Sequence, residues 1–290
     1  MILVTGSTGN VGRELVRELA ARDTPFRVLV RDRTRAVQPP DHAERVVADL
    51  DDPSTLPAAF AGADTLFLLT PGIGLAHTAH AVAAASAAGV GRIVHLSSFN
   101  VLGDPMPAMG RWHHDREEAI RATGIPATFL RPGGFMTNAL DWLPTLREGR
   151  YVLDPAGPGR YAPVDPADIA AVAALALTED GHEGAEYVLT GAETFTVAEQ
   201  AAVIADTVGV PLTVRDVATA EEAVRSRFPN GAPPALAAAL AEGFALMRAD
   251  TVGLRTDTVE KLLGRAPGTF AAWCARHADV FRAAVTDARP

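Results

Sequence analysis

The sequence predicts an α/β fold, a Rossmann-type doubly wound parallel sheet with a smaller, mostly helical C-terminal lobe. Short apolar runs alternate with helical patterns through the first half of the chain, which is typical of βαβ units. A glycine-rich turn joins the first apolar run to the first helical pattern, where such sheets bind nucleotides. With 290 residues, the chain is long enough for one large domain or two unequal lobes.

The strands of the first half are expected at its short apolar runs. Residues 65–70 are almost continuously apolar, which indicates a strand that is buried on both faces. The expected strands cover residues 1–5, 26–30, 45–48, 65–70, 93–96 and 127–130.

Helices are expected between these strands. Val11, Leu15 and Leu19 fall on one helical face after the glycine-rich turn. Gly89 suits the C-terminal cap of an alanine-rich helix. The later helices of this half are expected at about residues 52–62, 75–88 and 115–122.

The alternation of strands and helices stops after residue 131. Short strands are expected at 151–153, 160–162 and 186–189, a helix at 165–178, and mostly helices from 196 to the end. We therefore expect a Rossmann domain over residues 1–150 and a smaller substrate-binding lobe over 151–290. Part of residues 160–190 is expected to return to the sheet.

Composition excludes several classes of protein. Lys and Arg total 26 against 35 Asp and Glu, a formal net charge of −9 that argues against a nucleic-acid partner. The single cysteine, Cys274, rules out an intrachain disulfide. His77 and His80 lack an evident third ligand, so no metal site is expected. Apolar stretches too short for a bilayer and the lack of an export signal predict a cytoplasmic protein without a membrane partner.

Residues 5–12 read Thr-Gly-Ser-Thr-Gly-Asn-Val-Gly and predict a phosphate-binding turn. Gly6 permits the tight turn, Gly9 lets the backbone approach a pyrophosphate, and Gly12 lets helix and strand pack closely. The start of the following helix offers N–H groups and a positive dipole end to the phosphates. The cofactor-binding residues expected here are Gly6, Thr8, Gly9, Asn10, Val11 and Gly12.

The residues after the second strand indicate which nucleotide is bound. Arg31 stands where an NAD-preferring site usually carries a carboxylate, and its guanidinium suits a 2′-phosphate. Arg13 could also face that phosphate, whereas Arg33 and Arg35 are more simply read as a solvated loop. Asp32 keeps NADH as an alternative, and NADPH is the expected cofactor.

The glycine turn resembles that of the short-chain dehydrogenase/reductase superfamily. Further segments resemble its atypical NmrA-like branch: Val30-Arg31-Asp32, His113…Glu117…Gly124, and residues 130–138, 164–170 and 187–191. The resemblance runs across roughly the first two hundred residues. It implies NAD(P)H binding in a Rossmann fold with a smaller C-terminal lobe. Members of the family include quinone and azo reductases and non-catalytic sensors of nucleotide redox state.

The same resemblance assigns further cofactor contacts by position. Asp49 and Leu50 would flank the adenine, and Ser97 ends the fifth strand. The ribose and nicotinamide side would be lined by Thr70, Pro71, Gly72, Pro132, Gly133 and Phe135.

The usual catalytic Tyr-x-x-x-Lys pair of the superfamily is missing, because the one lysine is Lys261 and no tyrosine precedes it at that spacing. At the expected distance after Ser97, His113 and Glu117 share a helix face, and the carboxylate would favour an imidazolium that can donate a proton. Ser97, His113 and Glu117 are therefore the candidate catalytic residues. The alternative is that His113 only shapes the pocket or caps the helix.

These features predict an NADPH-dependent oxidoreductase that transfers hydride to a quinone, enone or ketone-type small molecule. Loss of the Tyr–Lys pair is tolerable for acceptors that are already electrophilic, whereas reduction of a ketone needs a group such as His113 to protonate the developing alkoxide. The alternative is a non-catalytic NAD(P)-sensing regulatory protein of the NmrA type. A sugar-nucleotide epimerase ranks third, since it would need the missing pair. Either a monomer or a homodimer is compatible with the sequence.

Overall fold

The computed structural model describes residues 1–32, 43–217, 219–228, 230–249 and 253–287. The described chain forms two compact units. The first comprises the described parts of Met1–Met106, Gly110–Pro132 and Pro166–Leu189, and the second the described parts of Pro107–Met109, Gly133–Asp165 and Thr190–Pro290.

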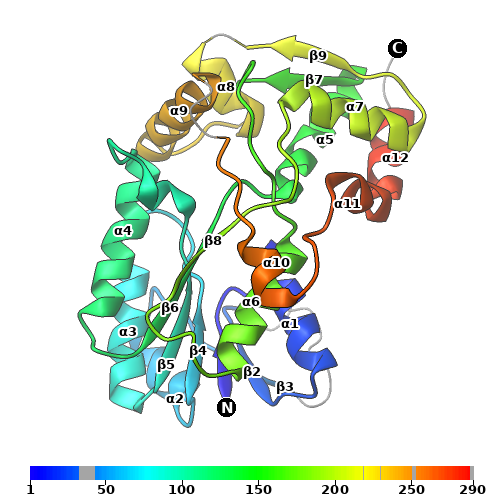
Figure 1. The fold of residues 1–290 in the computed structure, drawn as a ribbon. Coiled ribbons are helices and arrows are strands. Elements are labelled where there is room, and N and C mark those ends of the chain that lie inside the picture. The colour runs from blue at the N-terminus through cyan, green and yellow to red at the C-terminus, as the bar shows by residue number, and fades with distance from the viewer. Residues whose placement is uncertain (33–42, 218, 229, 250–252, 288–290) are drawn as a thin grey trace. The chain divides into compact units, whose positions relative to one another are not determined.

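The first unit is built on a seven-stranded sheet in which every neighbouring pair is parallel (Figure 1). The strand order is β3-β2-β1-β4-β5-β6-β8, so the chain reverses direction across the sheet between β1 and β4. The strands are β1 (Ile2–Val4), β2 (Phe26–Val30), β3 (Ala43–Val47), β4 (Thr65–Leu68), β5 (Arg92–Leu96), β6 (Ala127–Pro132) and β8 (Glu186–Leu189). The predicted doubly wound Rossmann-type sheet is confirmed.

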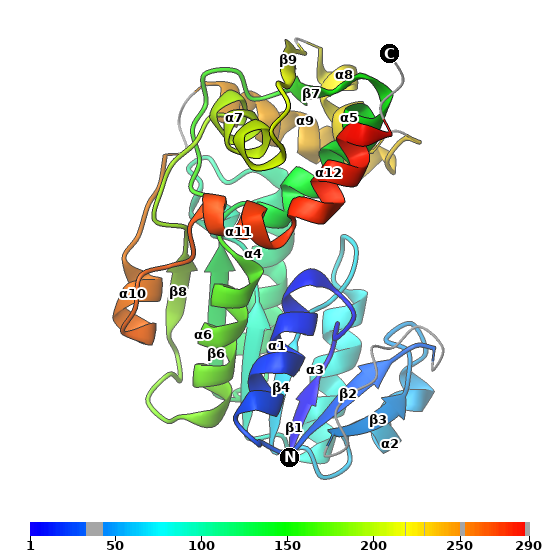
Figure 2. The same ribbon diagram turned by 90° about the vertical axis from the view of Figure 1, so that its right-hand side faces the viewer.

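Helices cover both faces of this sheet. The α2 (Leu56–Phe60), α3 (Ala76–Ala88) and α4 (Ala108–Arg121) helices lie on one face, where a core that includes Leu66, Ile93 and Phe129 forms. On the other face, α1 (Asn10–Ala21) packs along α6 (Pro166–Thr178), and Figure 2 shows the two side by side in front of the strands. Short 3-10 helices, η1 (Pro53–Thr55) and η2 (Phe99–Leu102), complete the unit.

The second unit is mostly helical, as predicted for the C-terminal region. Its core includes the stacked rings of Phe270 and Trp273, with Phe281 edge-on to the indole. The elements of the unit are η3 (Met136–Trp142), α5 (Leu143–Gly149), β7 (Tyr151–Asp154), α7 (Val197–Val208), β9 (Thr213–Asp216), α8 (Ala220–Arg227), α9 (Pro234–Arg248), α10 (Thr258–Leu263), α11 (Phe270–Arg276) and α12 (Ala278–Thr286). The β7 and β9 strands form a separate parallel pair.

The structure differs from the sequence prediction in three local features. Residues 160–162 do not form a strand, because Tyr161 makes only an isolated bridge to Phe195. The α4 helix begins at Ala108 rather than near residue 115. The β9 strand was not predicted.

The domain boundary was predicted at residue 150, whereas the chain passes from the first unit to the second after Pro132. Met136, Ala139 and Leu146 belong to the core of the second unit, so residues 133–149 group with it. Residues 166–189 group with the sheet, where β8 pairs with β6. That these units fold as separate domains stays a prediction. Among the helices of the described residues, none is long and apolar enough to cross a bilayer.

Candidate dinucleotide site

The turn between β1 and α1 has the tight geometry that its glycines predict. Gly6 has a φ of +67°, a left-handed conformation that other residues rarely adopt, and its carbonyl accepts a 3.0 Å hydrogen bond from Gly9 N. Gly9 is the N-cap of α1 and contributes no side chain there. The space beyond the helix end is therefore clear for a phosphate group, which the helix dipole favours.

Gly9 and Gly12 have different roles in this turn. A Cβ on Gly9 would lie 3.4 Å from Gly6 O, an ordinary contact, whereas a Cβ on Gly12 would lie 2.1 Å from the same oxygen. Gly12 is thus required for α1 to pack against the turn itself rather than, as predicted, against the strand. Gly9 is not required by packing, so its lack of a side chain leaves room for a ligand.

Thr5 fixes the turn to the neighbouring strand end. Its hydroxyl donates to Leu69 O at 2.9 Å and accepts a 2.8 Å hydrogen bond from Leu69 N. These bonds join the carboxyl ends of β1 and β4, between which the strand order reverses. Ligands of doubly wound sheets bind in the crevice at this position.

A cavity of about 580 Å³ opens at this point of the first unit. Its volume lies within the range of small-molecule sites. The cavity is lined by Thr5, Gly6, Ser7, Thr8, Gly9, Leu29, Val30, Arg31, Asp32, Asp49, Leu50, Asp51, Leu69, Pro71 and His77. Seven of the predicted cofactor residues line it: Gly6, Thr8, Gly9, Arg31, Asp49, Leu50 and Pro71.

These residues fit a dinucleotide. The glycine turn forms the part of the wall that suits a pyrophosphate, and the exposed Arg31 side chain supplies a cation beside the end of β2. Asp32 lies in the same wall, so the carboxylate that would accept a ribose hydroxyl is also present. Arg13 is exposed on α1 and is not among the lining residues, and Arg33 and Arg35 lie outside the described residues.

The other predicted cofactor residues do not line this cavity. Val11 and Gly12 are buried beneath the turn, and Thr70 is buried with no hydrogen-bond partner for its hydroxyl among the described residues. Gly133 and Phe135 belong to the second unit. Cofactor contacts stay predictions for Asn10, Val11, Gly12, Thr70, Gly72, Ser97, Pro132, Gly133 and Phe135.

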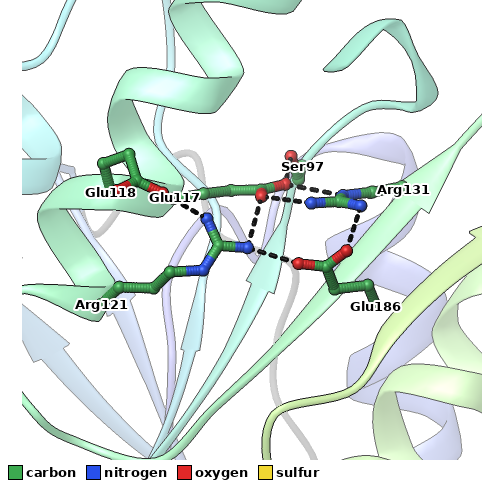
Figure 3. A network of polar contacts seen from close by, with 6 residues as sticks. All are labelled: Ser97, Glu117, Glu118, Arg121, Arg131 and Glu186. Atoms are coloured by element: carbon green, nitrogen blue, oxygen red, sulfur yellow. Dashed lines mark hydrogen bonds and ion pairs between the residues drawn. The ribbon is translucent and has the colours of Figure 1, made fainter. Parts of the chain in front are cut away.

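Ser97 and Glu117 form the buried end of a network of hydrogen bonds and ion pairs (Figure 3), whose members Arg121, Glu118 and Glu186 are partly exposed. Ser97 Oγ donates to Glu117 Oε1 at 2.5 Å, and the Arg131 guanidinium donates to both oxygens of Glu117, from Nε at 3.0 Å and from Nη2 at 2.6 Å. Arg121 Nη2 donates to Glu117 at 3.0 Å and to Glu186 at 2.5 Å, and Arg131 Nη1 also pairs with Glu186. The network therefore ties together α4, β6, β8 and the end of β5.

The network holds Glu117 as a carboxylate. Its side chain is fully buried, and burial alone would raise its pKa. Hydrogen bonds from Arg131 and Ser97 and the charges of Arg131 and Arg121 outweigh burial and keep the pKa below its ordinary value. Glu117 accepts from two guanidinium groups and a hydroxyl, so its charge is already compensated within the network.

The expectation that Glu117 keeps His113 charged is wrong. Burial, together with the nearby positive charge of Arg116, lowers the pKa of His113 to about 4, and the Glu117 carboxylate only partly opposes this. The imidazole is therefore neutral at pH 7. Its Nδ1 is buried without a hydrogen-bond partner among the described residues. That His113 is catalytic stays a prediction, but it does not start from an imidazolium.

Two groups that the sequence interpretation missed hold the segment between β4 and α3. The buried Arg116 side chain donates to Gly72 O at 2.7 Å and to Gly74 O at 3.0 Å. His77 contacts Asp51 and Pro71 across the cavity. Gly72 and Gly74 have positive φ angles, but nothing in the sequence shows which cationic side chain donates hydrogen bonds to their carbonyl oxygens.

The parallel sheet, the glycine turn and the cavity at the reversal of strand order together define a dinucleotide-binding α/β protein. Residues 6–180 match a family described as NAD(P)H-binding, which is more than half of the chain. The chain therefore belongs to this NAD(P)H-binding family, and its predicted resemblance to the NmrA-like branch of the short-chain dehydrogenases/reductases is confirmed.

Named relatives match nearly the whole chain. An NAD(P)H azoreductase of Xenophilus azovorans is 38% identical, over 98% of this chain and 100% of the relative. The crystal structure of an NADPH-dependent quinone oxidoreductase from Escherichia coli in complex with NADPH has a TM-score of 0.82 and 27% identity, covering 95% of this chain and 99% of that one. The Citrobacter sp. triphenylmethane reductase complexed with NADP(H) has a TM-score of 0.81 and 27% identity, covering 96% and 99%.

Proposed function

We propose that the protein is an NADPH-dependent reductase that transfers hydride to a quinone, enone or ketone-type small molecule. The observation that carries this proposal is the cavity at the reversal of strand order, which the glycine turn and Arg31 line together. The azoreductase and quinone oxidoreductase among the relatives support a reductase that acts on an electrophilic small molecule.

Arg31 favours NADPH over NADH in this proposal. An exposed guanidinium at the end of β2 can donate two hydrogen bonds to a 2′-phosphate, which neutral ribose lacks. The glycine turn then holds the pyrophosphate, and Asp49 and Leu50 flank the adenine. The NADPH and NADP(H) complexes among the similar structures support this assignment.

The bound cofactor supplies the hydride, so the chain's residues mainly orient the acceptor and exclude water. For a quinone, the proton that completes reduction comes from water, because His113 is neutral above about pH 4. Ser97 and Glu117 act as positioning residues in this proposal, since Ser97 Oγ donates to the Glu117 carboxylate, which also accepts from Arg131. Their network holds the carboxyl ends of β5 and β6 in place.

The experiment that tests this function follows the absorbance of reduced nicotinamide with a panel of quinones, enones, ketones and azo dyes. A reductase oxidises NADPH with at least one acceptor, and NADH more slowly. Tight NADPH binding without oxidation by any acceptor would favour the non-catalytic sensor instead.

The proposal also covers the protein's partners, its location in the cell and its oligomeric state. A small-molecule acceptor is the expected partner, and the net charge of −9 supports the absence of a nucleic-acid partner. The protein is proposed to work in the cytoplasm, without a membrane partner, as a monomer or homodimer.

A further inference from the structure

His77, in the first turn of α3, joins two walls of the dinucleotide cavity. Its Nε2 lies 2.6 Å from Asp51 Oδ1, in the segment that follows β3, and its Nδ1 lies 3.2 Å from Pro71 O, in the segment that follows β4. All three residues line the cavity. The side chain of His77 is 22% exposed and that of Asp51 is 69% exposed, so the ion pair lies at the solvent-exposed edge of the cavity.

The atoms that face the ring determine how many protons it must carry. A backbone carbonyl oxygen only accepts hydrogen bonds, and so does an ionised carboxylate. Each ring nitrogen of His77 faces one of these acceptors, so each must carry a hydrogen if both bonds are to form. A neutral imidazole has one N–H and can make only one of the two bonds. The complete arrangement therefore requires the imidazolium.

The neighbouring His80 gives a useful contrast. Its Nδ1 lies 2.7 Å from Leu50 O, and this is a single acceptor that a neutral ring can satisfy with its one N–H. His80 also holds the segment that follows β3, one turn further along α3, and it is not among the residues that line the cavity. The two histidines thus fasten the same segment, but only His77 needs both protons to do so.

We propose that His77 is a positioning residue for the nicotinamide dinucleotide, and that its doubly protonated ring holds the adenine-side and ribose-side walls at the spacing that binds the cofactor. The inference rests on the proposed function, because it concerns the same cavity. Walls that are already fixed lose less conformational freedom on binding, so cofactor affinity is higher when both bonds are formed. A ring that carries one hydrogen makes only one of the two bonds, so cofactor affinity is lower in that form.

Other charged groups face this part of the cavity and are common to every variant below. Arg31, Asp32 and Asp49 line it, and Asp49 Oδ1 accepts a 3.0 Å hydrogen bond from Asp51 N. From α4, Arg116 holds the Gly72 and Gly74 carbonyls of the segment that follows Pro71. A difference between wild type and a His77 variant at one pH therefore reports on His77 and its partners rather than on these groups.

The experiment measures the dissociation constants of NADH and NADPH by calorimetry from about pH 5.5 to about pH 8, the range in which histidine changes charge. NADH is included because the 2′-phosphate of NADPH titrates in this range itself. For wild type, we expect NADH affinity to fall about two- to fivefold across the range, the size of a partly exposed ion pair. The variants are His77→Gln and Asp51→Asn, with His80→Gln as the matched control.

Both His77→Gln and Asp51→Asn should bind NADH with an affinity that is nearly independent of pH, since neither retains the ion pair. His80→Gln should keep the wild-type pH dependence, whatever its effect on affinity at a single pH. A wild-type pH dependence in folded His77→Gln would overturn the proposal, and so would a flat profile in His80→Gln. If wild type binds neither nucleotide at any pH, the proposed function itself fails, which is a different result.

Discussion

Arg31 and Asp32 are adjacent residues of opposite charge in the wall of one cavity, and they illustrate how far a single residue determines cofactor choice. The sequence places them at the end of β2, where the ribose of a dinucleotide is recognised. We expect Arg31→Ala to weaken NADPH binding by about 1–3 kcal/mol, the cost of losing hydrogen bonds to a charged group, and NADH binding very little. Titration calorimetry with both nucleotides measures this.

Arg13→Ala serves as the control for that comparison. Arg13 is exposed and is not among the cavity-lining residues, so its removal should affect the two nucleotides alike. Equal losses of NADH and NADPH affinity in Arg31→Ala would show that Arg31 does not contact the 2′-phosphate.

His113 shows where reasoning from single residues fails. A carboxylate four residues away on a helix predicts a charged imidazole, and Glu117 does lie at that spacing. The sequence could not show that Arg121 and Arg131 already compensate Glu117, or that Arg116 places a positive charge near the ring. A pKa set by burial and by residues on other elements cannot be derived from local spacing.

At the scale of elements, two glycines of the β1–α1 turn have different roles: Gly9 leaves room for the ligand, and Gly12 allows the helix to pack against the turn. We expect Gly9→Ala to fold with a melting temperature close to wild type, because its Cβ would make an ordinary contact, but to lose most of its NADPH affinity. In Gly12→Ala, the Cβ would lie 2.1 Å from Gly6 O, and the resulting strain should destabilise the protein by about 1–3 kcal/mol. Thermal unfolding and NADPH titration of both variants test this, and normal NADPH binding by Gly9→Ala would place the cofactor elsewhere.

The network in Figure 3 gives a second prediction at this scale. Glu117→Gln leaves Arg131 without its buried counter-charge, so we expect a loss of about 3–5 kcal/mol in the free energy of unfolding. Glu118→Gln is the matched control. Glu118 also pairs with Arg121, at 2.7 Å, but it is 55% exposed, and its loss should cost less than about 1 kcal/mol. Equal effects in urea unfolding would show that the network does not stabilise the fold.

Over the whole molecule, two histidines, the buried His95 and the partly buried His113, make stability depend on pH. Burial, then the repulsion that a protonated His113 would exert, lowers the pKa of His95 to about 3, and burial lowers that of His113 to about 4. Both rings are neutral in the folded protein, whereas in the unfolded chain they gain protons below about pH 6.5. The free energy of unfolding should therefore fall as the pH decreases from about 6.5 toward 4, each histidine contributing up to about 1.4 kcal/mol per pH unit.

Urea unfolding at several pH values measures this slope. His95→Gln and His113→Gln should each lower the number of protons taken up on unfolding by about one, and the slope decreases in proportion. A stability that stays constant over this range in wild type would mean that the two rings are accessible to protons in the folded state.

The sequence predicted the sheet well because strand and helix periodicities are local. The ranges of β2 and β8 match the prediction, and the reversal of strand order follows from the βαβ pattern. The isolated bridge at Tyr161 could not be distinguished from a strand by its short apolar pattern. Contacts that join distant parts of the chain were not predictable, among them those of Glu117 with Arg131 and of His77 with Asp51.

The most direct test of the central claim, that this cavity binds NADPH and the protein passes its hydride to an acceptor, uses NADPH deuterated at the hydride-donating carbon of either face. With an enone as acceptor, the deuterium is retained on carbon in the product. We predict that wild type gives a deuterated product from one of the two deuterated forms, and that folded Gly9→Ala gives none. Tight NADPH binding by wild type with no label transferred to any acceptor would contradict the claim.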